Sequence, residues 1–320
     1  MCGIFGVLGA KDPALLASMR SRLAHRGPDG HGAFLADDVS LGHVRLAIID
    51  VEMGAQPLTN EAGDLQIIVN GEIYNHRQLR TELSGHAFAT DSDSEVVLHL
   101  YEEYGPAGFS KLDGMFAFAI HDHGDLILCR DPIGIKPLYY AREGGRLYFA
   151  SELKALLPVA GEVREFPNGC YYHSRTGLHC YHRLAGQERT GESFEDCAKR
   201  VAHLLDRSVH KRLMSDVPLG VFLSGGLDSS LTSMLARRYI DDLHSFSVGF
   251  PWGADIEHSR AMAEFIKTEH HHYPLDRQEM VDHLPEVIYH LESYDAALVR
   301  SAVPNYFLCK LASEYVTVVL

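Results

Sequence analysis

The first part of the chain, from residue 1 to about 182, alternates short apolar runs with turn-forming residues. Short runs bounded by glycine, proline and asparagine are typical of β-strands. The clearest of them are residues 65–69, 115–120, 125–129 and 147–150. Helical periodicity interrupts the strands only at about 13–24 and 94–104. Many strands with few helices between them predict a layered α+β domain over residues 1–182.

A second pattern begins at Ser193, which is predicted to cap a helix with Asp196 as its capping-box partner. The apolar positions of this helix predict one apolar face, formed by Phe194, Cys197, Val201, Leu204, Leu205, Val209 and Leu213. Beyond it, the pattern predicts strands at 217–223, 243–250 and 316–320 and helices at 229–239, 257–267, 277–291 and 301–314. Alternating strands and helices indicate an α/β domain with a Rossmann-like parallel sheet over residues 193–320.

Residues 183–192 join the two parts, and their polar composition with two glycines predicts a linker. The last predicted strand coincides with the end of the sequence. Ligands of open α/β sheets bind beyond the carboxyl ends of the strands. We therefore expect residues 193–320 to be a truncated domain, containing only its N-terminal part.

The net charge and hydropathy of the chain limit the kinds of partner that it can bind. The formal net charge is −14, whereas a protein that binds nucleic acid or anionic membranes needs a basic surface. No apolar run approaches the ~18 residues of a membrane span, and the N-terminus lacks the regions of a signal peptide. We expect a cytoplasmic protein that binds neither nucleic acid nor membranes.

The six cysteines include no C-x-x-C pair, which argues against a zinc ribbon or a thioredoxin-like site. Cys170 and Cys180 could form a disulfide, but free thiols are the expectation in a reducing cytoplasm. The segment 269–272, Glu-His-His-His, suggests a metal site. Consecutive residues of a strand point to opposite faces, so the sequence does not favour one ion held by all four.

Cys2 is the first candidate for chemistry. Removal of Met1 would leave a thiol and an α-amino group on the same residue, and an amine of pKa ~7.7–8.0 can accept the thiol proton near neutral pH. The thiolate is the reactive form of cysteine. Taken alone, Cys2 is as consistent with a frayed terminus as with a nucleophile.

Motifs further along the chain favour the nucleophile. They are residues 25–29 (His-Arg-Gly-Pro-Asp), 45–50 (Arg-Leu-Ala-Ile-Ile-Asp), 70–75 (Asn-Gly-Glu-Ile-Tyr-Asn) and 91–95 (Asp-Ser-Asp-Ser-Glu). Individually, Asn70-Gly71 is a hairpin-turn signal, Asp93 a helix cap and Arg45 a surface residue. Together with Cys2, the motifs resemble the class II glutamine amidotransferases, which belong to the N-terminal-nucleophile family. The resemblance covers residues 1–182 and implies an αββα sandwich.

The resemblance also implies a role for each motif. Cys2 would attack the glutamine carboxamide, and the Asn70 side chain with the Gly71 backbone N–H would stabilise the oxyanion. Arg45 would bind the α-carboxylate of glutamine, and Glu72 with Asp93 its α-ammonium group. Backbone groups of Leu46, Ala47, Ile48 and Ile49 would complete the pocket. Arg26 would either take part in the site or only brace its loop.

Residues 223–230, Leu-Ser-Gly-Gly-Leu-Asp-Ser-Ser, lie between a predicted strand and a predicted helix. Glycines, hydroxyls and a helix N-terminus are typical of an anion-binding loop. No Gly-Lys-Ser/Thr follows, so the loop is not a Walker A motif. It resembles the pyrophosphate-binding loop of the ATP pyrophosphatase ligases. That resemblance implies ATP binding by Leu223, Ser224, Gly225, Gly226, Asp228, Ser229, Ser230 and Val248, with Asp228 as a Mg²⁺ ligand.

A Cys2 amidase joined to this ATP loop resembles the glutamine-hydrolysing asparagine synthetases. The implied reaction adenylates aspartate with ATP, releases pyrophosphate and transfers ammonia from glutamine to the β-aspartyl-AMP. Two alternatives stay open: a related ligase for another carboxylic acid, and a non-catalytic amidase-like binding protein. The small-molecule partners would be glutamine, aspartate and ATP. A homodimer is left as an open expectation.

Overall fold

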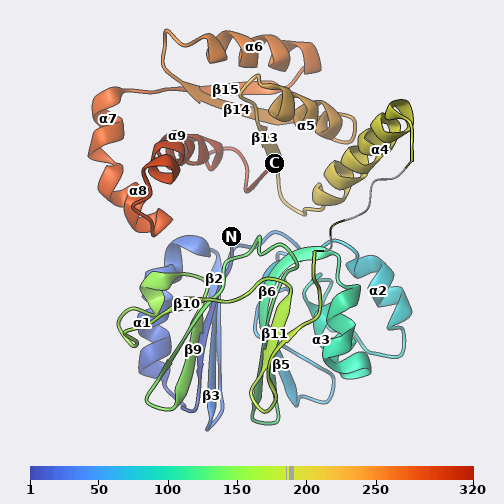
Figure 1. The fold of residues 1–320 in the computed structure, drawn as a ribbon, viewed down its shortest axis with the longest axis vertical. Helices are drawn as coiled ribbons and strands as arrows, with labels where there is room; N and C mark the ends of the chain where they lie inside the picture. The colour runs from blue at the N-terminus through green and yellow to red at the C-terminus, as the bar shows by residue number, and fades with distance from the viewer. Residues whose placement is uncertain (185, 187–190) are drawn as a thin grey trace. The chain divides into compact units, whose positions relative to one another are not determined.

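A computed structural model describes residues 1–184, 186 and 191–320. The chain forms two compact units, Met1–Gln187 and Glu188–Leu320 (Figure 1). The break between them falls within residues 183–192, and part of that predicted linker lies outside the described residues.

The first unit contains two six-stranded antiparallel sheets. One sheet has the order β10-β8-β9-β1-β3-β2, and the other has the order β12-β11-β7-β6-β5-β4. The strands of the first sheet are β1 (Gly3–Leu8), β2 (Gly30–Leu35), β3 (Val39–Arg45), β8 (Tyr139–Glu143), β9 (Arg146–Ala150) and β10 (Arg164–Glu165). Those of the second are β4 (Leu58–Thr59), β5 (Leu65–Ile73), β6 (Gly114–Asp122), β7 (Asp125–Arg130), β11 (Cys170–His173) and β12 (Gly177–Cys180).

Three apolar clusters show how the layers pack. The cluster between the sheets combines Ile4 and Leu41 of the first sheet with Ile68 and Leu128 of the second. The outer face of the first sheet packs on α1 (Pro13–Leu23) and η3 (Leu153–Ala155). The outer face of the second packs on α2 (His76–Glu82), α3 (Glu95–Tyr104) and η2 (Gly105–Lys111). The predicted αββα sandwich is confirmed, and its layers are visible in Figure 1.

The strands predicted from apolar runs are those buried on both faces. All six residues of β7 are buried, because this strand lies inside the sandwich. In contrast, β2 is partly or fully exposed along its whole length and was not predicted. It begins directly after the polar loop that contains Pro28 and Asp29. A strand at the edge of a sheet carries no continuous apolar signal.

The expectation that Cys170 and Cys180 are free thiols is wrong, because the structure joins them in a disulfide. The two residues are direct partners in the register of the β11–β12 hairpin, and their Cα atoms are 4.0 Å apart. A register of this kind depends on the turn at residues 174–176, which sequence spacing alone does not determine.

The second unit has a four-stranded parallel sheet with the order β15-β14-β13-β16, as the alternating pattern predicted. Its strands are β13 (Leu219–Phe222), β14 (His244–Gly249), β15 (Glu269–Pro274) and β16 (Val318–Val319). Its helices are α4 (Phe194–Arg212), α5 (Leu227–Arg237), α6 (Ala254–Ile266), α7 (Arg277–Asp282), α8 (Leu284–Leu291) and α9 (Ala296–Ala312).

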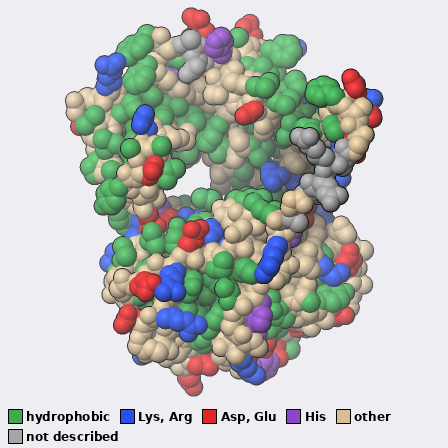
Figure 2. All heavy atoms as spheres, viewed as in Figure 1, with side chains coloured by type: hydrophobic (Ala, Val, Ile, Leu, Met, Phe, Trp, Pro, Cys, Tyr) green, Lys and Arg blue, Asp and Glu red, His purple; other side chains and the backbone are tan. Residues whose placement is uncertain are grey.

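One prediction for this unit needs correction. Residues 277–291 form two helices rather than one, because α8 starts afresh at Leu284 with Pro285 in its first turn, a position that suits proline. The predicted apolar face of α4 is only partly covered: Val209 is buried, but Phe194 is 83% exposed and Val201 63% exposed. Other apolar side chains of this unit, such as Tyr294, are also exposed, and hydrophobic atoms are plentiful on the face that Figure 2 shows.

Alternation along β15 follows the predicted rule. His270 and His272 face Ser245 and Ser247 of β14, whereas His271 lies beside His244 on the opposite face. Across the part of the chain that is described, no helix has both the length and the apolarity needed to cross a membrane.

Candidate active site

Cys2 directly precedes β1, a strand with a hydrogen-bonded neighbour on each side. The first residue of β1, Gly3, pairs with Val44 of β3. The Leu46 backbone N–H donates to Cys2 Sγ at 3.4 Å, and Arg26 Nε donates to the Cys2 carbonyl oxygen at 2.9 Å. The thiol is therefore held by neighbouring backbone and does not belong to a frayed end.

Arg26 has a definite role in this arrangement. Its side chain is buried and forms an ion pair of 2.7 Å with Glu152, which also contacts His25 and Lys154. Burial alone would raise the Glu152 pKa, but hydrogen bonds from His25, Lys154 and Arg26 lower it to about 2. Arg26 thus links the backbone of Cys2 to an ionised buried carboxylate, and it braces Cys2 as well as its own loop.

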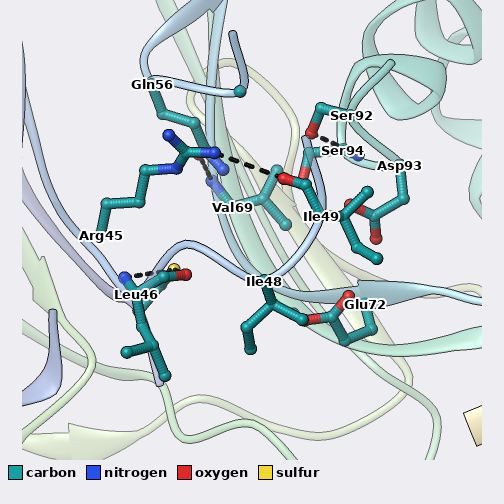
Figure 3. A pocket seen from close by; sticks show the side chains of 13 residues that line it. Arg45, Leu46, Ile48, Ile49, Gln56, Val69, Glu72, Ser92, Asp93 and Ser94 are labelled. Carbon is teal, nitrogen blue, oxygen red and sulfur yellow. Dashed lines mark hydrogen bonds between the residues drawn. The ribbon is translucent and has the colours of Figure 1, made fainter. Parts of the chain in front are cut away.

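A pocket opens at Cys2 (Figure 3). The predicted residues that line it are Cys2, Arg45, Leu46, Ile48, Ile49, Gly71, Glu72 and Asp93. Five further residues line it that the sequence did not single out: Gly54, Gln56, Val69, Ser92 and Ser94. Ala47 and Asn70 belong to the surrounding layer, and the Ala47 N–H donates to Asp29 at 2.8 Å.

Opposite charges lie on opposite sides of this pocket. In Figure 3 the Arg45 guanidinium is on one side, and the carboxylates of Glu72 and Asp93 are on the other. Arg45 donates to the carbonyl oxygens of Ile49, Asp50 and Val51, at 3.3, 2.6 and 2.9 Å. The arginine therefore also shapes the loop 46–51, a role that the sequence did not indicate.

The two carboxylates occupy an unfavourable environment. Burial raises the pKa of Asp93 to about 6, although the Ile73 N–H donates to it at 2.6 Å. Burial, and to a smaller extent the negative charge of the nearby Asp93, raises the Glu72 pKa well above its ordinary value. Oε2 of Glu72 is buried without a hydrogen-bond partner in the described structure. A cationic group of a ligand would relieve both the burial and the like-charge repulsion.

Asn70 and Gly71 lie within β5 and are not a hairpin turn. Asn70 is 1% exposed, and its Nδ2 has no hydrogen-bond partner among the described residues. A buried unpaired amide is destabilising, so it is expected where a ligand supplies the missing acceptor. A Cβ on Gly71 would collide with the Met115 carbonyl of β6, so the neighbouring strand already requires glycine here.

The protonation state of the thiol depends on the groups around it. Burial raises the Cys2 pKa, whereas the Leu46 N–H lowers it. Burial also lowers the pKa of the Met1 amine to about 6. Lys136, which the sequence did not single out, is buried with its Nζ 3.6 Å from Met1 Sδ, and burial lowers its pKa. A base beside Cys2 is therefore needed before the thiol can react.

The second candidate site is the loop between β13 and α5. The hydroxyl groups of Ser224 and Ser229 are 2.8 Å apart, and Ser224 Oγ accepts from the Gly226 N–H at 3.3 Å. Gly225 has φ +80°, and a Cβ there would approach His258 of α6 to 2.6 Å. Asp228 is exposed in the first turn of α5, and Ser230 follows it in the helix.

Leu223 and Val248 lie at the carboxyl edge of the parallel sheet. The Leu223 N–H donates to the Phe246 carbonyl of β14 at 2.8 Å, and Val248 is two residues further along that strand. Both side chains pack into apolar clusters, so only their backbone groups are positioned to contact a ligand.

The two-sheet sandwich, with a cysteine directly before a central strand, has the αββα layers of the N-terminal-nucleophile fold. The chain belongs to the glutamine amidotransferase domain family, whose model matches residues 1–184. Residues 200–320 match the model described as asparagine synthase. The structure of glutamine phosphoribosylpyrophosphate amidotransferase from B. subtilis, complexed with ADP and GMP, covers 76% of this chain and 65% of its own, with TM-score 0.50 and 21% identity. That likeness supports the fold alone.

Curated relatives are similar over both units. Asparagine synthetase [glutamine-hydrolyzing] of Zea mays is 41% identical over 97% of this chain and 56% of its own length. Asparagine synthetase B [glutamine-hydrolyzing] of Escherichia coli (strain K12) is 41% identical over 97% of this chain and 60% of its own length. The chain therefore spans less than two thirds of the relatives that it matches.

Asp93→Asn should stabilise the ligand-free protein at neutral pH. A carboxyl pKa raised from ~3.9 to about 6 contributes stability below pH ~4 that is lost as the pH rises through 6. Asparagine is neutral throughout, so the variant should gain roughly 1–3 kcal/mol over the unchanged protein between pH 4 and 7.5. Urea unfolding at several pH values without glutamine measures this gain. A gain that does not grow with pH would show that Asp93 is not a buried charge.

Proposed function

We propose that the first unit hydrolyses glutamine to glutamate and ammonia at Cys2. The observation that carries the proposal is the pocket itself, where a thiol lies between a guanidinium and two buried carboxylates. Glutamine has an α-carboxylate, an α-ammonium group and a carboxamide, one for each of these partners. The glutamine amidotransferase family of residues 1–184 supports the same substrate.

The chemistry begins with removal of Met1, which leaves the Cys2 amine free to accept the thiol proton. The thiolate then forms a bond to the carboxamide carbon, and the negative charge moves to its oxygen. The Asn70 amide and the Gly71 N–H would donate to that oxygen. The carbon–nitrogen bond breaks, and the leaving nitrogen takes a proton as ammonia. Water hydrolyses the resulting thioester to give glutamate and regenerates the thiol.

Each end of the substrate would have its own charge partner. Arg45 would bind the α-carboxylate with guanidinium N–H groups that remain beside its contacts to the 49–51 carbonyls. Glu72 and Asp93 would bind the α-ammonium group, which restores their ordinary ionisation. Backbone groups of Leu46, Ala47, Ile48 and Ile49 would line the remaining wall. Gly54 lets Arg45 approach this loop, because a Cβ there would lie 2.6 Å from Arg45 Nη2.

We further propose that the ammonia is used to make asparagine. The asparagine synthase match of residues 200–320 and the similarity to asparagine synthetases support this step. ATP would bind through Leu223, Ser224, Gly225, Gly226, Ser229, Ser230 and Val248, and Asp228 would hold Mg²⁺. Aspartate would be adenylated, pyrophosphate released, and ammonia would displace AMP. A cytoplasmic homodimer is the assembly proposed for the protein.

A ligase for another carboxylic acid is the second candidate. It would share the same pocket at Cys2 and the same ATP loop, so only the acid acceptor distinguishes the two. The 41% identity to asparagine synthetases favours aspartate. A purely binding protein is disfavoured, because it would not need a buried unpaired amide at Asn70, next to Gly71 of the pocket that contains the thiol.

Cys2→Ala should abolish glutamate release from glutamine, because it removes the atom that forms the thioester. Cys197→Ala is the matched control, since it removes a partly exposed thiol of the second unit. Glutamate release is followed for both variants with an enzyme-coupled assay. If the Cys2→Ala variant releases glutamate as fast as the control does, Cys2 is not the nucleophile.

Asn70→Ala should lower kcat by ~10²–10³ with little change in KM, because an oxyanion donor acts mainly in the transition state. Unfolding in urea should show only a modest loss of stability, from the cavity that the smaller side chain leaves, since the lost Nδ2 has no partner in the described structure. Asn168→Ala, at a surface position, provides the control. An increase in KM with unchanged kcat would show that Asn70 binds glutamine in the ground state and does not stabilise the oxyanion.

Asp228→Asn should weaken binding of ATP in the presence of Mg²⁺ by tenfold or more, while ATP alone binds both proteins equally. The reason is that an amide is a poorer Mg²⁺ ligand than a carboxylate. Calorimetric titration with and without Mg²⁺ measures the difference. Asp242→Asn changes another exposed carboxylate, outside the loop, and should behave as the unchanged chain. A Mg²⁺ dependence that survives in Asp228→Asn would count against this ligand.

A further inference from the structure

Two histidines and two glutamates converge on the outer side of the first unit, away from the residues that line the pocket. Glu61 precedes β5, His86 follows α2, and His99 and Glu102 lie one turn apart on α3. One ligand atom from each lies within 4.8 Å of all the others. We call these four residues the His–Glu cluster. Figure 1 shows α2 and α3 side by side in the same layer.

The distances within the His–Glu cluster have a narrow range. Nδ1 of His99 is 2.8 Å from Glu102 Oε2 and 3.3 Å from Glu61 Oε2. Nδ1 of His86 is 3.2 Å from Glu61 Oε1 and 3.7 Å from Glu102 Oε2. A tetrahedral ion with bonds of ~2.0–2.1 Å places its ligand atoms about 3.4 Å apart. Two of these contacts run to different oxygens of Glu61, and with one atom from each side chain the separations reach at most 4.8 Å, so a small adjustment of the side chains would bring all four onto a single ion.

Carboxylates also lie near the far sides of the two imidazoles. Nε2 of His99 is 3.5 Å from a Glu95 oxygen without forming a hydrogen bond, and Nε2 of His86 is 3.7 Å from Glu103. The remaining oxygen of Glu102 accepts from Asn60 Nδ2 at 2.7 Å. Histidines that bind a metal through one nitrogen commonly present the other to a carboxylate, which fixes the tautomer. This outer layer is independent of the inner distances and points to the same use.

The charges around the cluster lack a basic side chain to balance them. Glu61, Glu95, Glu102 and Glu103 surround the two imidazoles, and no ion pair recorded for the described residues joins any of them to lysine or arginine. His99 is completely buried, and among the recorded ion pairs only the two imidazoles carry the positive charge that could balance these carboxylates. A divalent cation would offset the two inner carboxylates and leave both imidazoles neutral.

We propose that the His–Glu cluster binds a divalent transition-metal ion, with Zn²⁺ as the best match to two imidazole nitrogens and two carboxylate oxygens. The ion joins the segment before β5, the segment after α2 and the middle of α3. Its role is structural, because all four coordination positions are filled by protein. Asp93 and Ser94 of the pocket directly precede α3, so an ion that fixes this helix also steadies one wall of the pocket.

The experiment titrates Zn²⁺ into the metal-stripped chain and follows heat and thermal unfolding. It uses His271→Gln as the background, because His244, Glu269 and His271 form the other group of possible ligands in the described structure. One Zn²⁺ should bind and raise the unfolding temperature. Co²⁺ in its place should show no thiolate charge-transfer band, which separates the cluster from the cysteines.

Two variants locate the ion. His86→Gln removes a ligand from a partly exposed side chain, and Glu102→Gln keeps the shape of α3, so both are expected to fold. Each should weaken Zn²⁺ binding at least tenfold and abolish the thermal shift. His31→Gln, on β2, should bind Zn²⁺ as the background does. The proposal is overturned if Zn²⁺ does not bind, or if it binds His86→Gln and Glu102→Gln as tightly as the background.

Discussion

The pairing of β1 between β3 and β9 is the constraint on which the rest of the first unit depends. A residue next to a chain terminus is normally free to move. Here the strand that follows Cys2 is buried and bonded on both sides, and Arg26 ties the Cys2 carbonyl to Glu152. The end of β3 then delivers Arg45 and Leu46 beside the thiol. Once β1 is in place, the nucleophile and one wall of the pocket have fixed positions.

The opposite wall comes from the other sheet and from α3. The strand β5 carries Asn70, Gly71 and Glu72 in succession, and Asp93 reaches the pocket from the segment before α3. These groups remain polar in a buried place: Asn70 has an unpaired donor, and burial raises the pKa of both carboxylates, with Asp93 raising that of Glu72 further. The stability lost there is offset by the apolar packing between the sheets and beneath α3. Such local strain is expected where a ligand completes the polar contacts.

Sequence reasoning succeeded where a signal was local. Continuous apolar runs predicted β6 and β7, and the order of short motifs brought Cys2, Arg45, Glu72 and Asp93 into one hypothesis that the pocket geometry supports. It failed where the deciding contact is remote in sequence. The Cys170–Cys180 disulfide depends on hairpin register, and the need for glycine at 71 comes from β6, more than forty residues away. Lys136 carried no motif, because its position near Cys2 is a product of the fold.

The exposed half of α4 also shows that the sequence does not predict contacts between remote segments. Its apolar positions predict one apolar face, and amphipathic periodicity states correctly which residues share a face. It does not state what covers that face, since this depends on elements elsewhere in the chain. Val209 is buried because β13 and α5 pack against it, whereas Phe194 and Val201, nearer the start of the helix, remain exposed. Periodicity therefore predicts the orientation of a helix more securely than its burial. A site built on loops between strands has no such periodicity, so its geometry can be obtained only from the tertiary structure.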